Sequence, residues 1–177
     1  MTPETPRWPN FPACYSWLSL DRRGGWRLQG ERVDHRGLIE FINRQYGHDE
    51  TGCWFMQNGP QRVFVRLACT PWIFRRACEG FVSHTGIAAG PLHTILVDDS
   101  GSILLAAELG IGLLDDRDLP QFLAECRDAT GQPASEQALL DLMARREAEI
   151  FWGEHRLQAI TAAELPACYG FVLDPQP

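Results

Sequence analysis

The sequence contains no lysine, and all sixteen of its basic residues are arginine. This absence excludes chemistry that requires a lysine amine, such as a Schiff base with a carbonyl substrate or the phosphate contact of a P-loop. The sequence also lacks a run of about 18 apolar residues, so it predicts no membrane-spanning helix. Its longest apolar candidate, Ile103 to Leu114, is interrupted by a glutamate and by glycines.

The six cysteines form no Cys-x-x-Cys pair, which removes the commonest sequence sign of a structural zinc or redox site. Several of them stand within apolar stretches, where a free thiol acts as a small hydrophobic residue. The N-terminus does not show the basic segment and hydrophobic core of a secretory signal. Together these features predict a cytoplasmic protein with reduced thiols.

The net charge of −7 and the isoelectric point near 5.2 disfavour general binding to nucleic acid, because the protein lacks the positive field that attracts phosphate backbones. The apolar fraction of 45% and the charged fraction of 22% are those of an ordinary globular protein. A chain of 177 residues is long enough for one domain or for two small units packed together.

The pattern of breakers and apolar segments divides the chain into four parts. Residues 1–13 carry a proline at every third position and are predicted to form an extended arm. Residues 14–79 form a first α+β repeat, 80–91 a glycine-rich connection, and 92–177 a second α+β repeat. The alternative is one continuous domain.

Within each repeat the sequence predicts short strands around one amphipathic helix. The first helix follows Asp34 and the second follows Asp115, each of which is a good N-cap residue, and Ser135 is predicted to cap a further helix. Strands are predicted at 15–20, 26–29, 92–98, 103–107, 150–152, 158–161 and 168–173, with a hairpin over 53–72.

The two halves share the same order of predicted strands and helix, which indicates internal duplication. The pattern Asp-x-Arg-x-Leu-x-x-Phe occurs without a gap at residues 34–41 and again at 115–122. The predicted fold class is therefore α+β, with two repeats of hairpin, helix and hairpin whose antiparallel sheets are covered by helices.

The first repeat resembles a known bacterial family. The run Leu20-Asp21-x-x-Gly24-x-Trp26-x-x-x-Gly30, followed by an apolar helix and a strand after Gly52, is similar to the start of domain of unknown function 1285, or of a related uncharacterised family. The resemblance covers about residues 18–66 and ends after Val65, where Cys69-Thr70-Pro71-Trp72 replaces an acidic ending. It implies two similar α+β repeats and a signalling or binding role, and it transfers no catalytic residue.

Three groups of chemically active side chains lie close together in the sequence. They are Cys69, Cys78 and His84; His48, Asp49 and Glu50 with His84 and His93; and the acids of Asp98-Asp99 or of Asp115-Asp116-Arg117-Asp118. A reactive cysteine needs a neighbouring cation, and a zinc site needs four matched ligands, whereas acids at turns and helix starts are explained by local hydrogen bonds. The sequence therefore predicts no catalytic residue, no metal site and no cofactor.

Charge is distributed unevenly, and this points to a binding surface. Residues 51–78 contain four arginines and no acid. The alternation of a strand places Val63 and Val65 on one face, and Arg62, Phe64 and Arg66 on the other. Two arginines beside an aromatic ring suit an anionic ligand or an acidic protein surface, with Trp72 as a further contact.

The hairpin register modifies this prediction. Pro60 cannot donate a closing hydrogen bond, which favours a four-residue loop between Met56 and Gln61. Cys53 and Phe55 then share the face of the two arginines. This face is either open to a partner or packed against the acidic second half.

Three functions follow from these observations. The leading prediction is a non-enzymatic binding domain with a regulatory role, using the face of Arg62, Phe64 and Arg66. The alternatives are an enzyme with a site at the seam between the repeats near Cys78 and His84, and a structural subunit of a homo-oligomer.

Overall fold

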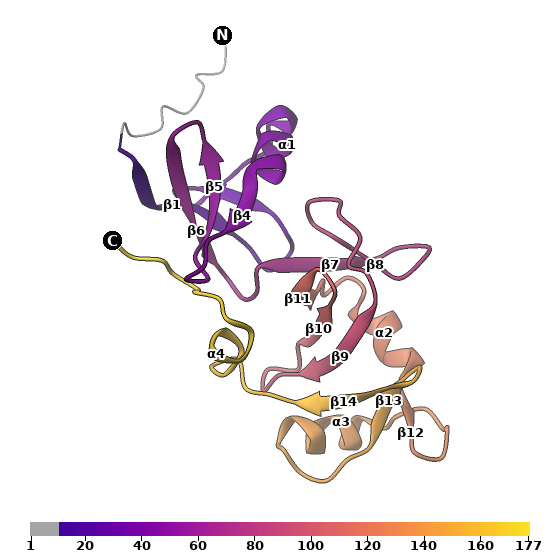
Figure 1. Cartoon of the computed structure of the whole chain (residues 1–177). Helices are drawn as coiled ribbons and strands as arrows, with labels where there is room; N and C mark the ends of the chain where they lie inside the picture. The colour runs from indigo at the N-terminus through magenta and orange to yellow at the C-terminus, as the bar shows by residue number, and fades with distance from the viewer. Residues whose placement is uncertain (1–10) are drawn as a thin grey trace.

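The protein forms two mixed β-sheets with a few short helices, as Figure 1 shows for the computed structural model, which describes residues 11–177. The strands are β1 Ala13–Leu20, β2 Trp26–Leu28, β3 Glu31–Arg32, β4 Tyr46–His48, β5 Trp54–Asn58, β6 Gln61–Leu67, β7 Trp72–Arg76, β8 Phe81–Ser83, β9 Leu92–Val97, β10 Ile103–Ala107, β11 Gly110–Leu114, β12 Arg127–Asp128, β13 Ile150–Trp152 and β14 His155–Ala159. The helices are α1 Arg36–Gln45, α2 Leu119–Glu125, α3 Glu136–Met143 and α4 Leu165–Tyr169. Most of the predicted arm, residues 1–10, lies outside the described part of the chain.

The strands of the two sheets follow related orders. The first sheet has the order β3-β2-β1-β6-β5-β4, and the second contains the order β11-β10-β9-β14-β13-β12. In each of them the pair at the centre, β1 with β6 and β9 with β14, is parallel. The prediction of antiparallel sheets was therefore wrong for the central pairs, because the third strand after each helix returns in the direction of the first strand of its half.

Strands β7 and β8 extend the second sheet, although they follow the first sheet in the chain. β7 pairs in parallel with β11, and β8 pairs with β7. The sequence predicts β7 at the end of the first repeat and β8 in the glycine-rich connection, whereas both belong to the second sheet. A β-carbon at Gly112 would lie 2.2 Å from the ring of Phe74, so the glycine allows β7 to lie flat against β11.

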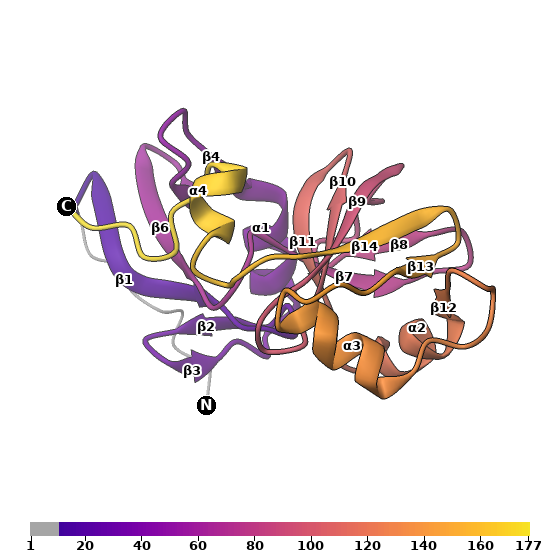
Figure 2. The ribbon, with the colours of Figure 1, turned by 90° about the horizontal axis from the view of Figure 1, so that it is seen from below.

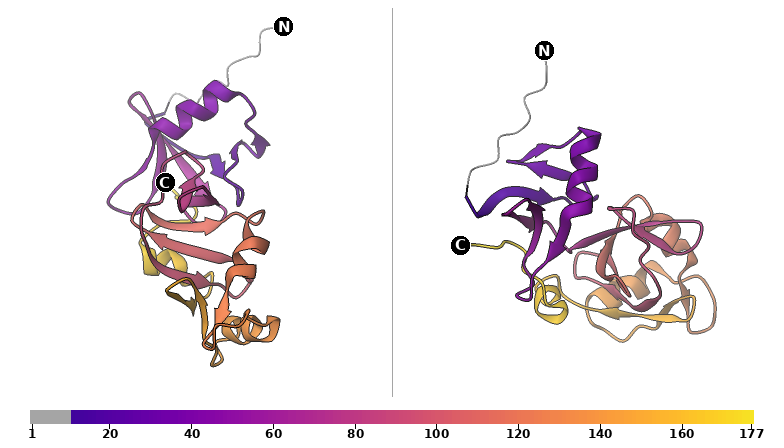
Figure 3. Two further views of the ribbon diagram at one scale, coloured as in Figure 1. Left: turned by 90° about the vertical axis from the view of Figure 1, so that its right-hand side faces the viewer. Right: turned by 45° about the horizontal axis from the view of Figure 1, so that its top comes forward.

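The buried apolar side chains of both halves form one connected cluster. Figure 3 shows the first half, indigo to purple, beside the second half, magenta to yellow, as two adjacent units. The largest fully buried side chains come from both of them: Trp26 and Ile42 from the first, and Phe74 and Phe122 from the second sheet and its helix. The two sheets consequently share one hydrophobic core.

The helix boundaries correct two of the three predicted N-caps. α1 is capped by His35, whose Nδ1 accepts from the Leu38 amide at 3.2 Å, and not by Asp34. α2 begins at Leu119 with Asp118 at the N-cap position, whereas the predicted cap, Asp115, lies buried in the turn before the helix. Ser135 caps α3 as predicted, with its Oγ accepting from the Ala138 amide at 3.1 Å. None of the helices within residues 11–177 has the length and apolarity needed to cross a membrane.

The C-terminal segment does not form the strand predicted at 168–173. It forms α4, which ends at Gly170 in the left-handed conformation, and it then runs to the first sheet (Figures 1 and 2). The Val172 amide donates to the Gly52 carbonyl at 3.0 Å, and the Leu67 amide donates to the Leu173 carbonyl at 2.7 Å. The end of the chain therefore joins β6 to the second half.

The hairpin of β5 and β6 has a tighter turn than predicted. Asn58 pairs with Gln61, and Phe55 pairs with Phe64, so Gly59 and Pro60 form a two-residue loop. Gly59 has a φ of 58°, and proline suits the second loop position because the closing hydrogen bond there does not use its nitrogen. The register differs from the prediction by two residues, which leaves every side chain on its predicted face.

Four turns repeat one hydrogen-bond pattern. Each begins with an aspartate whose Oδ1 accepts from the amides two and four residues later, at 2.7 to 3.2 Å, and each has a glycine of positive φ at its fourth position. The aspartates are Asp21, Asp49, Asp98 and Asp128. Asp21 and Asp98 lie between the first two strands of the two halves, Asp49 follows β4, and Asp128 is the last residue of β12. We call these the Asp-x-x-Gly turns.

Candidate functional site

Strand β6 presents the predicted pair of arginines on the outer face of the first sheet. Val63 and Val65 are fully buried on the inner face, while Arg62 and Arg66 are exposed on the other. Phe64 lies between the arginines, and only 8% of its surface is exposed. The predicted alternation along this strand is confirmed.

An aromatic layer covers Phe64. The ring of Tyr15 stacks on it with centroids 4.6 Å apart and an interplanar angle of 5°, and Phe55 meets its edge at 5.9 Å. The guanidinium of Arg62 lies 4.6 Å from the centre of the Phe55 ring, which is a cation–π distance. We call this surface, with Arg62, Phe64 and Arg66 at its centre, the β6 face.

A bulge in β1 accompanies the position of Tyr15. The register of β1 against β6 shifts between Cys14 and Leu18, and Ser16 has a φ of 62°. A bulge inserts an extra residue and changes the direction in which the neighbouring side chains point. Sequence reasoning missed Tyr15 because nothing in the alternation of residues 15–20 marks a bulge.

The two arginines of the β6 face differ in their electrostatic environment. Arg62 lies 4.0 Å from Asp49, at the limit of an ion pair. Arg66 is exposed and has no acidic partner among residues 11–177. Two acids of the second half, Asp118 and Glu125, pair instead with Arg75 and Arg76 on β7.

Trp72 lies away from the β6 face, in a cluster of rings at the junction of the two sheets. Only 7% of Trp72 is exposed. Its ring packs 5.2 Å from Trp54 and 5.5 Å from Tyr46. The Tyr46 hydroxyl donates to the Pro71 carbonyl at 2.9 Å, so its polar group is satisfied inside the cluster.

His84 closes this junction as a neutral side chain. The Ile73 amide donates to its Nδ1 at 3.3 Å, which places the ring proton on Nε2. Nε2 is buried without a hydrogen-bond partner among the described residues, and the imidazole packs 5.4 Å from Trp26 and 5.7 Å from Tyr46, where an N–H can point at a ring face. Burial lowers the pKa of His84 to about 3, although Asp21 opposes this effect.

The cysteine and histidine suggested for a seam enzyme are not brought together. Ile73 lies at the start of β7 beside His84, whereas Cys78 is exposed in the turn beyond Arg76 and Phe81, the last pair of the β7–β8 hairpin. Within residues 11–177 no group of three or more His, Cys, Asp or Glu side chains is arranged to hold a metal ion.

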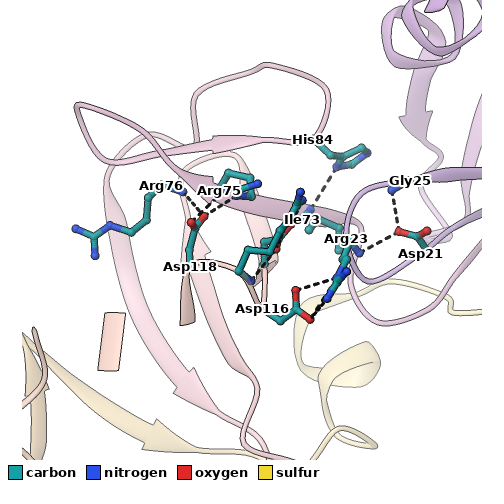
Figure 4. A network of polar contacts seen from close by, with 11 residues as sticks. Asp21, Arg23, Gly25, Ile73, Arg75, Arg76, His84, Asp116 and Asp118 are labelled. Carbon is teal, nitrogen blue, oxygen red and sulfur yellow. Dashed lines mark hydrogen bonds and ion pairs between the residues drawn. The ribbon is translucent and has the colours of Figure 1, made fainter. Parts of the chain in front are cut away.

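A network of acids and arginines joins the two halves beside His84 (Figure 4). Arg23, in the turn after β1, donates to both oxygens of Asp116 at 2.9 and 2.8 Å. Asp118 accepts from the Arg75 side chain at 2.6 Å and from the Arg76 amide at 2.9 Å. The Arg75 contact lowers the pKa of Asp118, which keeps that carboxylate charged.

Asp115 is the buried member of this acidic segment. Burial alone would raise its pKa, but hydrogen bonds from the side chain and amide of Arg117 outweigh burial and lower the pKa to about 2. A carboxylate that stays ionised and fully hydrogen-bonded holds a turn in place. The predicted reading of these acids as local structural groups agrees with this geometry.

The clefts on the described surface include two that contain arginines. One, of about 220 Å³, lies at the seam between Arg22, Arg23 and the turn 100–102. The other, of about 450 Å³, lies between the end of α3 and β14, and its arginines are Arg145, Arg146 and Arg156. Each of these three arginines is already paired with an acid.

The fold and the site define an α+β protein of two joined mixed sheets, with an arginine–aromatic surface on the first sheet. Residues 4–176 match the sequence profile of DUF2944, a family described as Protein of unknown function (DUF2946), and the chain belongs to this family. No curated protein matches it.

Two solved structures are similar to this chain. A DUF1285 family protein from Silicibacter pomeroyi DSS-3 superimposes with a TM-score of 0.54 at 14% sequence identity, over 89% of this chain and 86% of the other. A DUF1285 family protein from Shewanella baltica OS155 gives a TM-score of 0.41 at 13% identity, over 60% of this chain and 89% of the other. The resemblance to domain of unknown function 1285 is confirmed for the fold by the first of these structures.

Proposed function

We propose that this protein is a non-enzymatic binding module with a regulatory role, and that the β6 face binds an acidic segment of a partner protein. The observation that carries the proposal is Arg66, an exposed guanidinium without an acidic partner in residues 11–177, next to a stacked aromatic layer. Arginine forms paired hydrogen bonds with carboxylates and stacks on rings, so such a surface favours acidic side chains with adjacent apolar ones.

The spacing of the arginines indicates the form of the partner. Arg62 and Arg66 lie four residues apart on one strand, which separates them by roughly 13 Å. An extended peptide laid along β6 meets both arginines when its carboxylates are also four residues apart. Tyr15, whose ring stacks on Phe64, then contacts the side chain between them.

The test uses a labelled nine-residue peptide with glutamates four residues apart and one central leucine, measured by fluorescence anisotropy. The double variant Arg62→Glu, Arg66→Glu is expected to weaken binding at least about tenfold, equivalent to about 1.4 kcal/mol. The control variant Arg32→Glu, Arg36→Glu changes the net charge equally, but at exposed arginines of β3 and α1. Its affinity is expected to remain within about twofold of wild type.

Equal weakening by both double variants would show that only overall charge matters and would remove the β6 face as the site. Binding of the peptide to neither wild type nor control would exclude an acidic partner. Binding is also expected to weaken as salt rises, because exposed charge pairs are screened.

We also infer that the two halves arose by internal duplication. The related strand orders, the parallel central pairs and the Asp-x-x-Gly turns at corresponding places support this inference. The α3 helix, between β12 and β13, is then an insertion of the second half. Duplication makes the seam between the halves a pseudo-symmetric junction.

A further inference from the structure

The cleft at the seam is formed where two corresponding turns face one another. Asp21 begins the turn between β1 and β2, and Asp98 begins the turn between β9 and β10. The two turns touch through one hydrogen bond, from Arg22 Nη2 to Ser102 Oγ at 2.7 Å. The cleft of about 220 Å³ opens beside this contact.

Arg22 is the cation in this cleft that has no acid bound to it. Its neighbour Arg23 is neutralised by Asp116 through two hydrogen bonds. Arg22 is exposed, and no described residue forms an ion pair with it. The guanidinium also contacts the buried Cys69 thiol, and its other N–H groups, together with the hydroxyls of Ser100 and Ser102, form one polar end of the cleft.

The rest of the lining combines the Asp116 carboxylate, which Arg23 neutralises, with a wall of aliphatic side chains. Ile103, Leu113 and Leu114 are buried to within 3% of full burial, and Leu119 completes the apolar wall. A ligand with charge along its whole length would lose hydration where it contacts these side chains, which offer no hydrogen bond in return. The lining therefore favours a molecule with one anionic end and a short aliphatic body.

The size and charge of the cleft restrict the class of ligand further. Its volume lies below the ~300–1,000 Å³ of sites for drug-sized ligands. A single unpaired guanidinium matches one carboxylate in bidentate geometry, whereas a polyphosphate would need several cations. The larger cleft at α3 is a weaker candidate because acids already neutralise its three arginines.

We propose that the seam cleft binds a small aliphatic monocarboxylate, with the carboxylate between Arg22 and Ser102 and the alkyl chain against Ile103 and Leu113. This site is separate from the β6 face. The outcome of the test of the seam cleft has no bearing on the acidic-partner proposal, because the two sites share no residue.

The test is a titration of the full chain with hexanoate, followed by two-dimensional NMR of amides and methyl groups. We expect saturable shifts at the amides of residues 100–102 and at the methyls of Ile103 and Leu113, with a dissociation constant in the millimolar range. Hexan-1-ol, which has the same chain without the charge, is expected to bind at least about tenfold more weakly.

Two variants test where the carboxylate of hexanoate binds in the cleft. Arg22→Gln removes the guanidinium at an exposed position and is expected to weaken hexanoate binding at least about tenfold. Ser102→Ala removes the hydroxyl, keeps the amide that donates to Asp98, and is expected to weaken binding by a smaller factor. Arg36→Gln, at an exposed position on α1, is the control and should bind as wild type does.

Absence of saturable shifts, or shifts centred on residues outside the seam, would overturn the proposal. Equal binding of hexanol and hexanoate, or unchanged binding by Arg22→Gln, would also overturn it.

Discussion

At the scale of single residues, the junction between the sheets depends on a histidine that remains uncharged. His84 has one nitrogen bonded to the Ile73 amide and the other enclosed by aromatic rings. A protonated ring would carry its second proton on Nδ1, which faces the N–H donor of Ile73, so protonation would break that hydrogen bond. Gly24 lies so close that a β-carbon there would approach the His84 Cβ to 2.5 Å, which shows how tightly the first hairpin packs on it.

Replacement of His84 by asparagine is expected to flatten the dependence of stability on pH. The pKa is about 3 in the folded protein and near 6.5 when unfolded, so between these values the unfolded chain binds more protons and acid favours unfolding. The wild type should therefore lose roughly 2 kcal/mol between pH 6.5 and about pH 4.5 through this residue. In His84→Asn that loss should disappear, whatever the absolute stability of the variant.

Urea denaturation at several pH values measures this effect. The aspartates of the seam have lowered pKa values and lose their contribution only at more acidic pH, so they do not interfere in this interval. Parallel pH profiles for wild type and variant would contradict a buried, neutral His84.

At the scale of elements, the Asp-x-x-Gly turns determine where the hairpins reverse. The aspartate satisfies two amides that the loop leaves free, and the glycine takes the left-handed conformation that follows a type I turn in three-residue hairpin loops. Asp98 is buried to within 1% of full burial, whereas Asp128 is only partly buried. The same turn therefore contributes different amounts to the free energy of unfolding at different positions in the chain.

Asp98→Ala is expected to destabilise the protein by about 2 kcal/mol, because it leaves two partly buried amides without an acceptor. Asp128→Ala removes the same pair of hydrogen bonds where water can replace them, and should cost about 1 kcal/mol or less. Thermal or urea unfolding of the two variants makes the comparison. An equal loss would show that burial of the turn is unimportant.

Part of this structure could be predicted from the sequence, and the reason differs from element to element. Alternation identified the two faces of β6 because successive side chains along a strand point to opposite faces of the sheet. The cap at Ser135 was predicted because capping is local. The position of Trp72 could not be predicted, because β7 pairs with β11 across a large separation in sequence. The α4 helix was missed because residues 168–173 are apolar and short, a pattern that both a strand and a helix satisfy.

At the scale of the whole molecule, the two halves are held together by contacts at both ends of the seam. Arg23, Arg75 and their acids lie at one end, and the C-terminal segment lies at the other. The packing there is close: a β-carbon at Gly52 would lie 2.3 Å from the Gly170 carbonyl oxygen. Docking of the C-terminus should therefore contribute measurably to global stability.

Gly52→Ala tests this contribution, with Gly131→Ala as its matched control. Both glycines have the same place in an Asp-x-x-Gly turn, with φ of 81° and 82°, so alanine strains both backbones by about 1–2 kcal/mol. Nothing lies within 4 Å of a β-carbon at Gly131, whereas one at Gly52 meets the backbone of the C-terminal segment. Gly52→Ala should be more destabilising by at least about 1 kcal/mol.

Amide hydrogen exchange adds a positional readout. In Gly52→Ala, protection should fall at Leu67 and Val172, the amides that donate across this contact. Equal destabilisation by the two alanines, with unchanged exchange at Leu67, would show that the C-terminal segment adds little.

The return of the C-terminus to β6 also has a consequence for synthesis of the protein on the ribosome. The amide of Leu67 obtains its partner, the carbonyl of Leu173, only after nearly the whole chain has been made. β7 likewise waits for β11, and β9 waits for β14. The nascent first half therefore emerges with β7 paired only to β8 and with the end of β6 incomplete, until β11 and Leu173 have been synthesised.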